Sequence, residues 1–226
     1  MKSQLLESDT VDLWCVALDA ENFPNEDTRE ILSESERKRS QRYRFDRDRR
    51  RFVLARTALR WILGDYLQIS PQAVQFEYGD RGKPYLPDTA LSFNLSHSQD
   101  LALIAITWNR ALGVDLEYKR TIDSTALAQR FFSPREVAAL NQIAEPQRNA
   151  TFFDYWTCKE AYLKATGEGI AGLSGVEVSL TPEPRLFVQS PQTWTLQPLL
   201  VRSDYAAALV VEGEPVEVRW RKCDRG

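Results

Sequence analysis

Several residue types that carry common chemistry are scarce in this chain. The 226 residues include one histidine, His97, and three cysteines, Cys15, Cys158 and Cys223. An odd number of widely spaced cysteines predicts neither a disulfide framework nor a compact cysteine metal site, and it favours free thiols in a reducing, cytoplasmic setting. A nucleophilic cysteine needs a histidine base, so we interpret Cys158 as a packing residue unless the fold brings His97 beside it.

Long apolar runs and a strong net charge are also missing. No apolar run approaches the roughly 20 residues of a membrane-spanning helix, and no signal-peptide pattern is present. The formal net charge is −3, which creates no overall attraction for nucleic acid. We therefore expect no membrane and no nucleic-acid partner. A hydrophobic content of 43% suffices for one large domain or two small halves.

The first informative segment is an acidic strand at residues 113–117, which read Gly-Val-Asp-Leu-Glu. Alternate side chains of a strand share a face. Asp115 and Glu117 therefore point the same way, whereas Val114 and Leu116 point into a core.

The second informative segment is a helix over residues 152–164. Trp156, Glu160 and Lys164 recur at every fourth position, so they form one stripe along the helix. Gly167 follows, as is typical of a helix end.

Together these segments supply three carboxylates, on Asp115, Glu117 and Glu160. Like charges in one cleft repel unless a cation joins them, and oxygen ligands with open positions suit Mg²⁺. Lys164, one helical turn beyond Glu160, can then meet phosphate charge, which favours phosphoryl-type transfer. Taken separately, the two segments have a simpler interpretation, as a polar strand face and a surface Glu–Lys pair.

The two segments resemble the signatures of the 4′-phosphopantetheinyl transferase superfamily, in its larger, single-chain type named after the surfactin-synthetase activator. The family patterns are Gly-(Ile/Val)-Asp-x-Glu and Trp-x-x-Lys-Glu-(Ala/Ser)-x-x-Lys, and residues 113–117 and 156–164 match both without a gap. The resemblance implies an α+β fold of two similar halves, in a pseudo-twofold arrangement with the active site in the cleft between them. Residues 1–110 would form the half that contacts coenzyme A, and residues 111–226 the half with the metal and the catalytic helix.

The resemblance also implies an activity, that of a holo-[carrier-protein] synthase acting as a monomer. Such an enzyme moves the 4′-phosphopantetheine group from coenzyme A to a serine of an apo acyl or peptidyl carrier protein, and releases adenosine 3′,5′-bisphosphate. By this resemblance Asp115, Glu117 and Glu160 hold Mg²⁺, and Glu160, or a water that it orients, takes the serine proton. Lys164 stabilises or protonates the leaving phosphate. Asp115, Glu160 and Lys164 are thus the expected catalytic residues.

A basic region is expected to bind the phosphates of coenzyme A. Between Arg37 and Arg60 there are eleven Lys or Arg residues and two Asp residues. Such a run is usually a solvated helix face, but Arg49, Arg56 and Arg60 share one face, which favours a phosphate-binding wall. Where the family often has a lysine, this chain has Glu36.

The resemblance assigns further contacts to coenzyme A. A Gly-Lys-Pro loop wraps the adenine, a Ser-His pair meets a phosphate, and the tryptophan and first lysine of the helix signature contact the nucleotide side. The full set of expected coenzyme A contacts is Arg39, Arg51, Arg56, Gly82, Lys83, Pro84, Ser96, His97, Trp156 and Lys159.

The resemblance also implies that the carrier protein docks between the halves, and Leu127 and Phe131 are the expected contacts. Most aromatic residues near Pro134 belong to a core, but some can form an exposed ledge for a partner helix. Two other functions fit the same carboxylates: a metal-dependent nucleotide hydrolase that cleaves coenzyme A, and a non-catalytic coenzyme A-binding module. Fatty-acid, polyketide and nonribosomal-peptide carriers all remain open as substrates.

Local patterns predict several other elements. Ser33 and Glu36 form a capping-box pattern at the start of a short helix, and Asp46 is expected to cap a longer one. Residues 74–78 are expected to form a strand. A weak repeat relates residues 100–106 to residues 204–211, in line with two similar halves.

Overall fold

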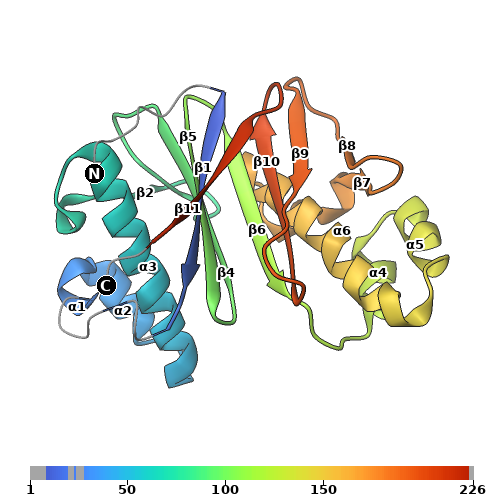
Figure 1. Ribbon diagram of the computed structural model, residues 1–226, viewed down its shortest axis with the longest axis horizontal. Coiled ribbons are helices and arrows are strands. Elements are labelled where there is room, and N and C mark those ends of the chain that lie inside the picture. The colour runs from blue at the N-terminus through green and yellow to red at the C-terminus, as the bar shows by residue number, and fades with distance from the viewer. Residues whose placement is uncertain (1–8, 20–22, 24–27, 224–226) are drawn as a thin grey trace.

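A computed structural model describes residues 9–19, 23 and 28–223. Two β-sheets lie at the centre, and a long helix covers the outer face of each, α3 on one side and α6 on the other (Figure 1). The mixed α+β fold is confirmed.

The strands are β1 (Thr10–Ala17), β2 (Glu77–Tyr78), β3 (Pro84–Tyr85), β4 (Leu91–Ser98), β5 (Leu101–Trp108), β6 (Leu112–Tyr118), β7 (Glu177–Ser179), β8 (Arg185–Phe187), β9 (Trp194–Pro198), β10 (Tyr205–Glu212) and β11 (Glu217–Lys222). The helices are α1 (Thr28–Ile31), α2 (Glu34–Ser40), α3 (Asp46–Leu67), α4 (Ser124–Phe131), α5 (Pro134–Asn141) and α6 (Glu145–Thr166), with 3₁₀ turns η1 (Pro71–Ala73) and η2 (Ile170–Gly175).

The two sheets repeat one strand order. The first sheet runs β11-β1-β5-β4 and the second runs β6-β10-β9, with β5 and β10 each antiparallel to both neighbours. In their order across the sheets, β1, β5 and β4 therefore correspond to β6, β10 and β9, which is consistent with two similar halves. β11 departs from a division at residue 110, because it pairs in parallel with β1 in the first sheet.

Apolar residues form three layers. One cluster packs α3 against the first sheet, a second packs α6 against the second sheet, and a third lies between the sheets. Val114 and Leu116 belong to the layer between the sheets, so the opposite face of β6, with Asp115 and Glu117, turns toward α6. The predicted alternation of this strand is confirmed.

Helix boundaries follow the local sequence in two of three predicted places. Ser33 and Glu36 form a full capping box on α2, and α6 ends at Gly167 with a φ of 80°. The prediction for Asp46 was wrong, because Asp46 is the first residue of α3 and Phe45 precedes it without a side-chain cap.

The strand predicted at residues 74–78 is shorter than expected. Pro71 begins the turn η1, and only Glu77–Tyr78 are extended as β2. Arg60 donates to the carbonyl oxygens of Pro71 and Val74 at 3.1 and 2.8 Å. These carbonyls are thereby used by a side chain instead of a neighbouring strand.

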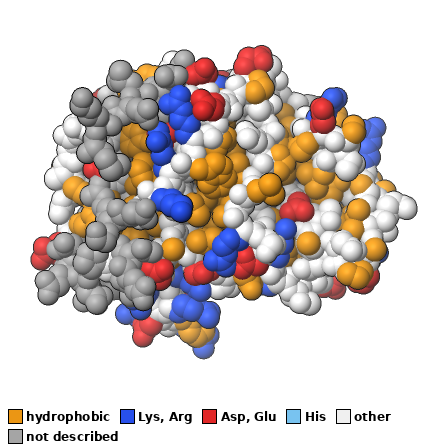
Figure 2. Space-filling view, viewed as in Figure 1, with side chains coloured by type: hydrophobic (Ala, Val, Ile, Leu, Met, Phe, Trp, Pro, Cys, Tyr) orange, Lys and Arg blue, Asp and Glu red, His pale blue; other side chains and the backbone are white. Residues whose placement is uncertain are grey.

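The surface in Figure 2 shows hydrophobic side chains gathered over the middle of this face, with charged side chains around them. Single exposed hydrophobic residues are ordinary on a folded protein. Among the residues that the structure describes, no helix is both long and apolar enough to cross a membrane.

Candidate active site

The site begins with a close approach of α6 to β6 at Gly113. A Cβ atom on Gly113 would lie 2.1 Å from the oxygen of Ala161 and 2.3 Å from the nitrogen of Ala165. Both atoms belong to the backbone of α6, so only glycine allows the helix to pack this closely. The contact brings Glu160 and Lys164 of α6 to the face of β6 that carries Asp115.

Asp115 and Lys164 meet directly. Lys164 Nζ lies 2.6 Å from Asp115 Oδ1 and donates to Ser96 Oγ at 2.8 Å. Ser96 Oγ also donates to Asp115 Oδ1 at 2.9 Å. Two segments 40 residues apart in the sequence, together with β4 of the other half, thus form one polar cluster.

Glu160 lies in the same cluster, but few nearby groups compensate the negative charge of its carboxylate. Its side chain is 9% exposed, and burial, followed by the charge of Asp115, raises the pKa of its carboxyl to about 7. Burial and Asp115 also raise the pKa of Glu117. The predicted repulsion among these three carboxylates is therefore present in the structure.

Polar side chains of β4 join the edge of the first sheet to the edge of the second. In this polar ladder Asn94 Oδ1, Ser96 Oγ and Ser98 Oγ accept the backbone N–H groups of Val114, Leu116 and Tyr118, at 2.9, 3.2 and 3.0 Å. β4 and β6 lie side by side at the centre of Figure 1. The roles of Asn94 and Ser98 were not predicted, although their spacing of two along a strand places them on the face of Ser96.

The expectation for Ser96 changes accordingly. Its hydroxyl donates its single proton to Asp115 and accepts from Leu116 and Lys164, which uses its full hydrogen-bonding capacity. Ser96 therefore orients Asp115 in this structure, and donation to a phosphate would require breaking that bond.

The three carboxylates partly fit a site for a divalent cation. Within residues 9–19, 23 and 28–223, no three acidic, histidine or cysteine side chains are close enough together to enclose an ion by themselves. However, Asp115 Oδ2 and Glu160 Oε1 are buried and have no hydrogen-bond partner. Buried carboxylate oxygens without donors suit a hard cation that keeps water or substrate ligands.

The basic region forms a surface pocket of about 620 Å³ beside α2 and α3. Its lining residues are Ser35, Glu36, Lys38, Arg39, Arg42, Tyr43, Phe52, Arg56 and Tyr78. Arg39 is exposed and lies over the ring of Phe52 at 5.4 Å. Cations beside aromatic faces are suited to a phosphorylated nucleoside.

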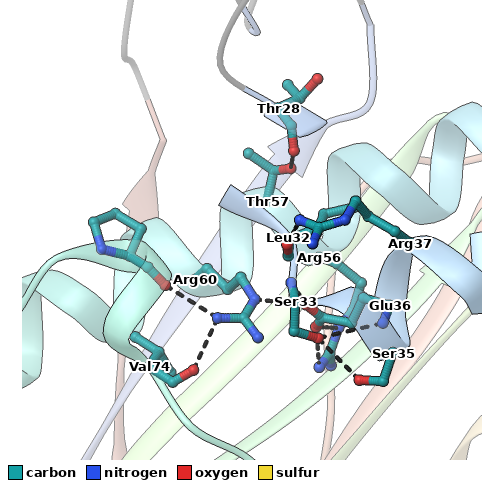
Figure 3. Close-up of polar contacts among 11 residues, drawn as sticks. Thr28, Leu32, Ser33, Ser35, Glu36, Arg37, Arg56, Thr57, Arg60 and Val74 are labelled. Atoms are coloured by element: carbon teal, nitrogen blue, oxygen red, sulfur yellow. Dashed lines mark hydrogen bonds and ion pairs between the residues drawn. The ribbon is translucent and has the colours of Figure 1, made fainter. Parts of the chain in front are cut away.

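Arg56 has a different main role from the one expected. Its Nε donates to Glu36 Oε1 at 2.6 Å, and Arg60 Nε donates to Glu36 Oε2 at 2.7 Å (Figure 3). All three side chains are at most 8% exposed. The face shared by Arg56 and Arg60 is therefore a buried ion cluster that docks α2 on α3, instead of a free phosphate-binding wall.

His97 connects the basic region with the acidic cluster. The side chain is open to solvent, yet the surrounding protein, and then the cations Lys164, Arg51 and Arg39, lower the pKa of its imidazole. The same cations that lower this pKa create a positive potential beside the ring, which suits an anion.

The Gly-Lys-Pro loop joins the two halves. Lys83 Nζ donates to the carbonyl oxygens of Ala165 and Leu112 at 2.8 and 3.2 Å, and burial lowers its pKa to about 8. Gly82 has a φ of 80°, as the turn before Lys83 requires. The ammonium of Lys83 thus caps the end of α6, while Gly82 and Pro84 shape the loop.

Lys159 cannot contact coenzyme A as expected. It is fully buried, donates to Glu136 Oε2 at 2.7 Å and also bonds the carbonyl oxygen of Val176. Trp156 is half-buried and packs edge-on against Phe131, with ring centroids 5.7 Å apart, beside the apolar cluster under α6. Its expected contact with coenzyme A stays a prediction.

The predicted docking residues are half-buried. Leu127 and Phe131 pack against the same apolar cluster, and Arg130 lies over the Phe131 ring. Cys158 is 1% exposed, and burial raises the pKa of its thiol, in agreement with a packing role.

Most of the chain matches known proteins in sequence. A profile described as the 4′-phosphopantetheinyl transferase superfamily matches residues 111–210, and one described as 4′-phosphopantetheinyl transferase, N-terminal, matches residues 25–109. The chain is 46% identical over 213 residues to the 4′-phosphopantetheinyl transferase HetI of Nostoc sp., covering 92% of this chain and 90% of that protein. The chain belongs to this superfamily.

Two further matches have lower sequence identity. The transferase psf-1 of Bacillus pumilus is 32% identical over 183 residues, covering 76% of this chain and 78% of that protein. A holo-(acyl-carrier-protein) synthase of Bacillus anthracis, solved in complex with coenzyme A (3′,5′-ADP), is 21% identical with a TM-score of 0.41, covering 45% of this chain and 94% of that chain.

Proposed function

We propose that this protein transfers the 4′-phosphopantetheine group from coenzyme A to a serine hydroxyl of an apo carrier protein. The main support is the meeting of Asp115, Glu160 and Lys164 at the junction of the two halves, with Lys164 Nζ 2.6 Å from Asp115. Membership of the transferase superfamily supplies the reaction class, and the site supplies groups that suit it.

Asp115, Glu117 and Glu160 would hold Mg²⁺. Their fit rests on the unpartnered oxygens of Asp115 and Glu160 and on the mutual repulsion that raises two of the carboxyl pKa values. A bound Mg²⁺ would supply neutralisation of the diphosphate of coenzyme A.

Glu160 is the best candidate for the base. With a pKa of about 7 its carboxylate can accept a proton near neutral pH, which is the favourable range for general-base catalysis. It would take the proton of the carrier serine, directly or through a water, as the serine oxygen attacks the phosphorus that bears pantetheine.

Lys164 would act on the leaving group. Its ammonium is partly exposed on the side of Asp115, with 28% of the side chain accessible. The leaving adenosine 3′,5′-bisphosphate gains negative charge as its bond to the transferred phosphorus breaks. A fixed cation at that place stabilises the transition state more than the ground state.

Arg39, Arg51 and His97 are the retained candidates for contacts with the phosphates of coenzyme A. The charges of Arg51 and Arg39 lower the pKa of His97, which supports the presence of positive potential beside the imidazole. Leu127 and Phe131 remain the proposed carrier contacts.

The direct test is an assay with a panel of apo carrier proteins. Each carrier is incubated with the enzyme, Mg²⁺ and coenzyme A, and its intact mass is measured. We expect one or more carriers to gain a single phosphopantetheine, and Asp115→Ala or a chelator to prevent this. Release of adenosine 3′,5′-bisphosphate without any carrier would instead indicate hydrolysis, and coenzyme A binding without either product would indicate a binding module.

A further inference from the structure

Each of two serines on β4 faces one carboxylate of β6. Ser98 Oγ donates to Glu117 Oε2 at 3.2 Å and accepts the backbone N–H of Tyr118 at 3.0 Å. Ser96 Oγ does the same for Asp115 and for Leu116, at 2.9 and 3.2 Å. In both cases the hydroxyl binds a carboxylate and the N–H of the residue that follows that carboxylate.

This arrangement fixes the direction of each hydroxyl proton. A serine hydroxyl has one proton to donate, and the N–H that points at its oxygen forces that proton elsewhere. The carboxylate is the acceptor that the structure provides. The backbone of β6 therefore acts as a rigid reference through which β4 orients the side chains of Asp115 and Glu117.

We propose that Ser98 is a positioning residue for the metal ligand Glu117, as Ser96 is for Asp115. The proposal rests on the proposed magnesium role of these carboxylates. Loss of a hydrogen bond to a metal-ligating group typically weakens metal binding by about 10- to 100-fold. Ser98 gives the cleaner test, because Ser96 also contacts Lys164.

The main alternative is that the polar ladder only joins the two sheets. Asn94 provides an internal comparison for this alternative. It accepts the N–H of Val114 at 2.9 Å, as the serines accept those of Leu116 and Tyr118. The residue before Val114 is Gly113, which has no side chain, so Asn94 supports the junction without orienting a carboxylate.

The experiment measures binding of Mn²⁺ as a probe for Mg²⁺, by electron paramagnetic resonance of the free ion. Neither coenzyme A nor carrier protein is present, so turnover plays no part. The proteins compared are the wild type, Ser98→Ala, Ser98→Thr, Asn94→Ala and Ser92→Ala. Ser92 lies on the same face of β4 outside the ladder, and a thermal melt of each variant confirms that it is folded.

We expect Ser98→Ala to weaken Mn²⁺ binding by about 10- to 100-fold and Ser98→Thr, which keeps the hydroxyl, to restore most of it. Asn94→Ala should lower the melting temperature while leaving Mn²⁺ affinity close to that of the wild type, and Ser92→Ala should change neither. Unchanged affinity in Ser98→Ala would overturn the positioning role alone, as would an equal loss in Asn94→Ala. A wild type that binds no Mn²⁺ would overturn the proposed metal role as well.

Discussion

β1 and β6 occupy corresponding positions beside β5 and β10, but their buried aspartates have different surroundings. β5 begins at Leu101, which pairs with Ala17 of β1. β10 begins at Tyr205, which pairs with Tyr118 of β6. In this register Asp12 and Trp14 of β1 correspond in position to Gly113 and Asp115 of β6. Each pair faces the long helix of its own half.

The difference lies in how each strand satisfies its aspartate. Asp12 is 3% exposed and accepts from the Tyr66 hydroxyl and from Arg221 Nε, the latter at 3.1 Å. Asp115 is 4% exposed, but its Oδ2 has no partner. The carboxylate of Asp12 is therefore bound by two side chains, whereas one oxygen of Asp115 has no partner among the residues that the structure describes.

The same comparison extends to a buried glutamate in each half. Glu36 and Glu136 both complete capping boxes, on α2 and α5, and both bind a cation of the next long helix. The cations differ: two arginines bind Glu36, whereas Lys159 binds Glu136. In both pairs a buried carboxylate is compensated by a cation of the neighbouring long helix.

The largest loss of stability is expected at Gly113, the position of β6 that corresponds to Asp12 of β1. Gly113→Ala should destabilise the protein by more than about 3 kcal/mol and abolish transfer, because the new Cβ meets backbone atoms of α6 that cannot move aside. Urea unfolding and the carrier assay measure both effects. Gly175→Ala is the control, since a Cβ there has no neighbour within 4 Å. Equal stability of the two variants would contradict the close approach of α6.

The next prediction separates the two glutamates. Glu36→Gln and Glu136→Gln each leave a buried cation without its partner, at a cost of about 3–5 kcal/mol. Burial already lowers the pKa of Lys159, so this amine can lose its proton when Glu136 is neutral, whereas a guanidinium stays charged.

The pH dependence distinguishes these variants. When the folded-state pKa of a lysine lies below its unfolded value of about 10.4, the unfolded chain binds more protons and stability rises with pH in that window. Glu136→Gln should therefore recover stability, relative to Glu36→Gln, as the pH rises toward the unfolded lysine pKa of about 10.4. Parallel stability curves for the two variants in urea would show that Lys159 keeps its proton.

A third prediction compares the cations that bind the two aspartates. Lys164→Met should lower the turnover rate by about a hundredfold, the scale for loss of one preorganised charge stabiliser, with a smaller effect on coenzyme A binding. Lys164→Arg should recover only part of the rate. Arg221→Met should lower stability and leave turnover unchanged, because Asp12 bonds Tyr66 and Arg221 and makes no bond to Asp115, Glu160 or Lys164. Single-turnover rates decide, and a normal rate in Lys164→Met would reduce Lys164 to a structural partner of Asp115.

The smallest change in stability is expected from Glu160→Gln. Because the pKa of Glu160 is raised from 4.5 to about 7, the folded protein binds its proton more tightly than the unfolded chain. Stability therefore falls as the pH rises from about 4.5 to about 7, and the full cost of ionisation is present above pH 7. At pH 8 the variant should be more stable than the wild type by about 1–2 kcal/mol, with no gain at pH 4, and it should be inactive. A thermal melt at the two pH values tests this, and a loss of stability at pH 8 would contradict it.

Much of this protein could be predicted from short stretches of its sequence. The alternation of residues 113–117, the helical stripe of Glu160 and Lys164, the capping box of Ser33 and the helix end at Gly167 all depend on local geometry. Each of these features was present in the structure, because backbone periodicity and terminal hydrogen bonds act over a few residues. The two signatures were also enough to identify the superfamily.

The partners of the buried charges depended on tertiary structure alone. Nothing near Arg56 or Lys159 in the sequence indicates that Glu36 and Glu136, about 20 residues away, would bury and bind them. The roles of Lys83 and Ser98 likewise arise only when loops and strands of one half meet the other. A charged side chain on a helix has the same local pattern whether it faces a phosphate, a carboxylate or water, and the low dielectric of the packed interior decides which of these it binds.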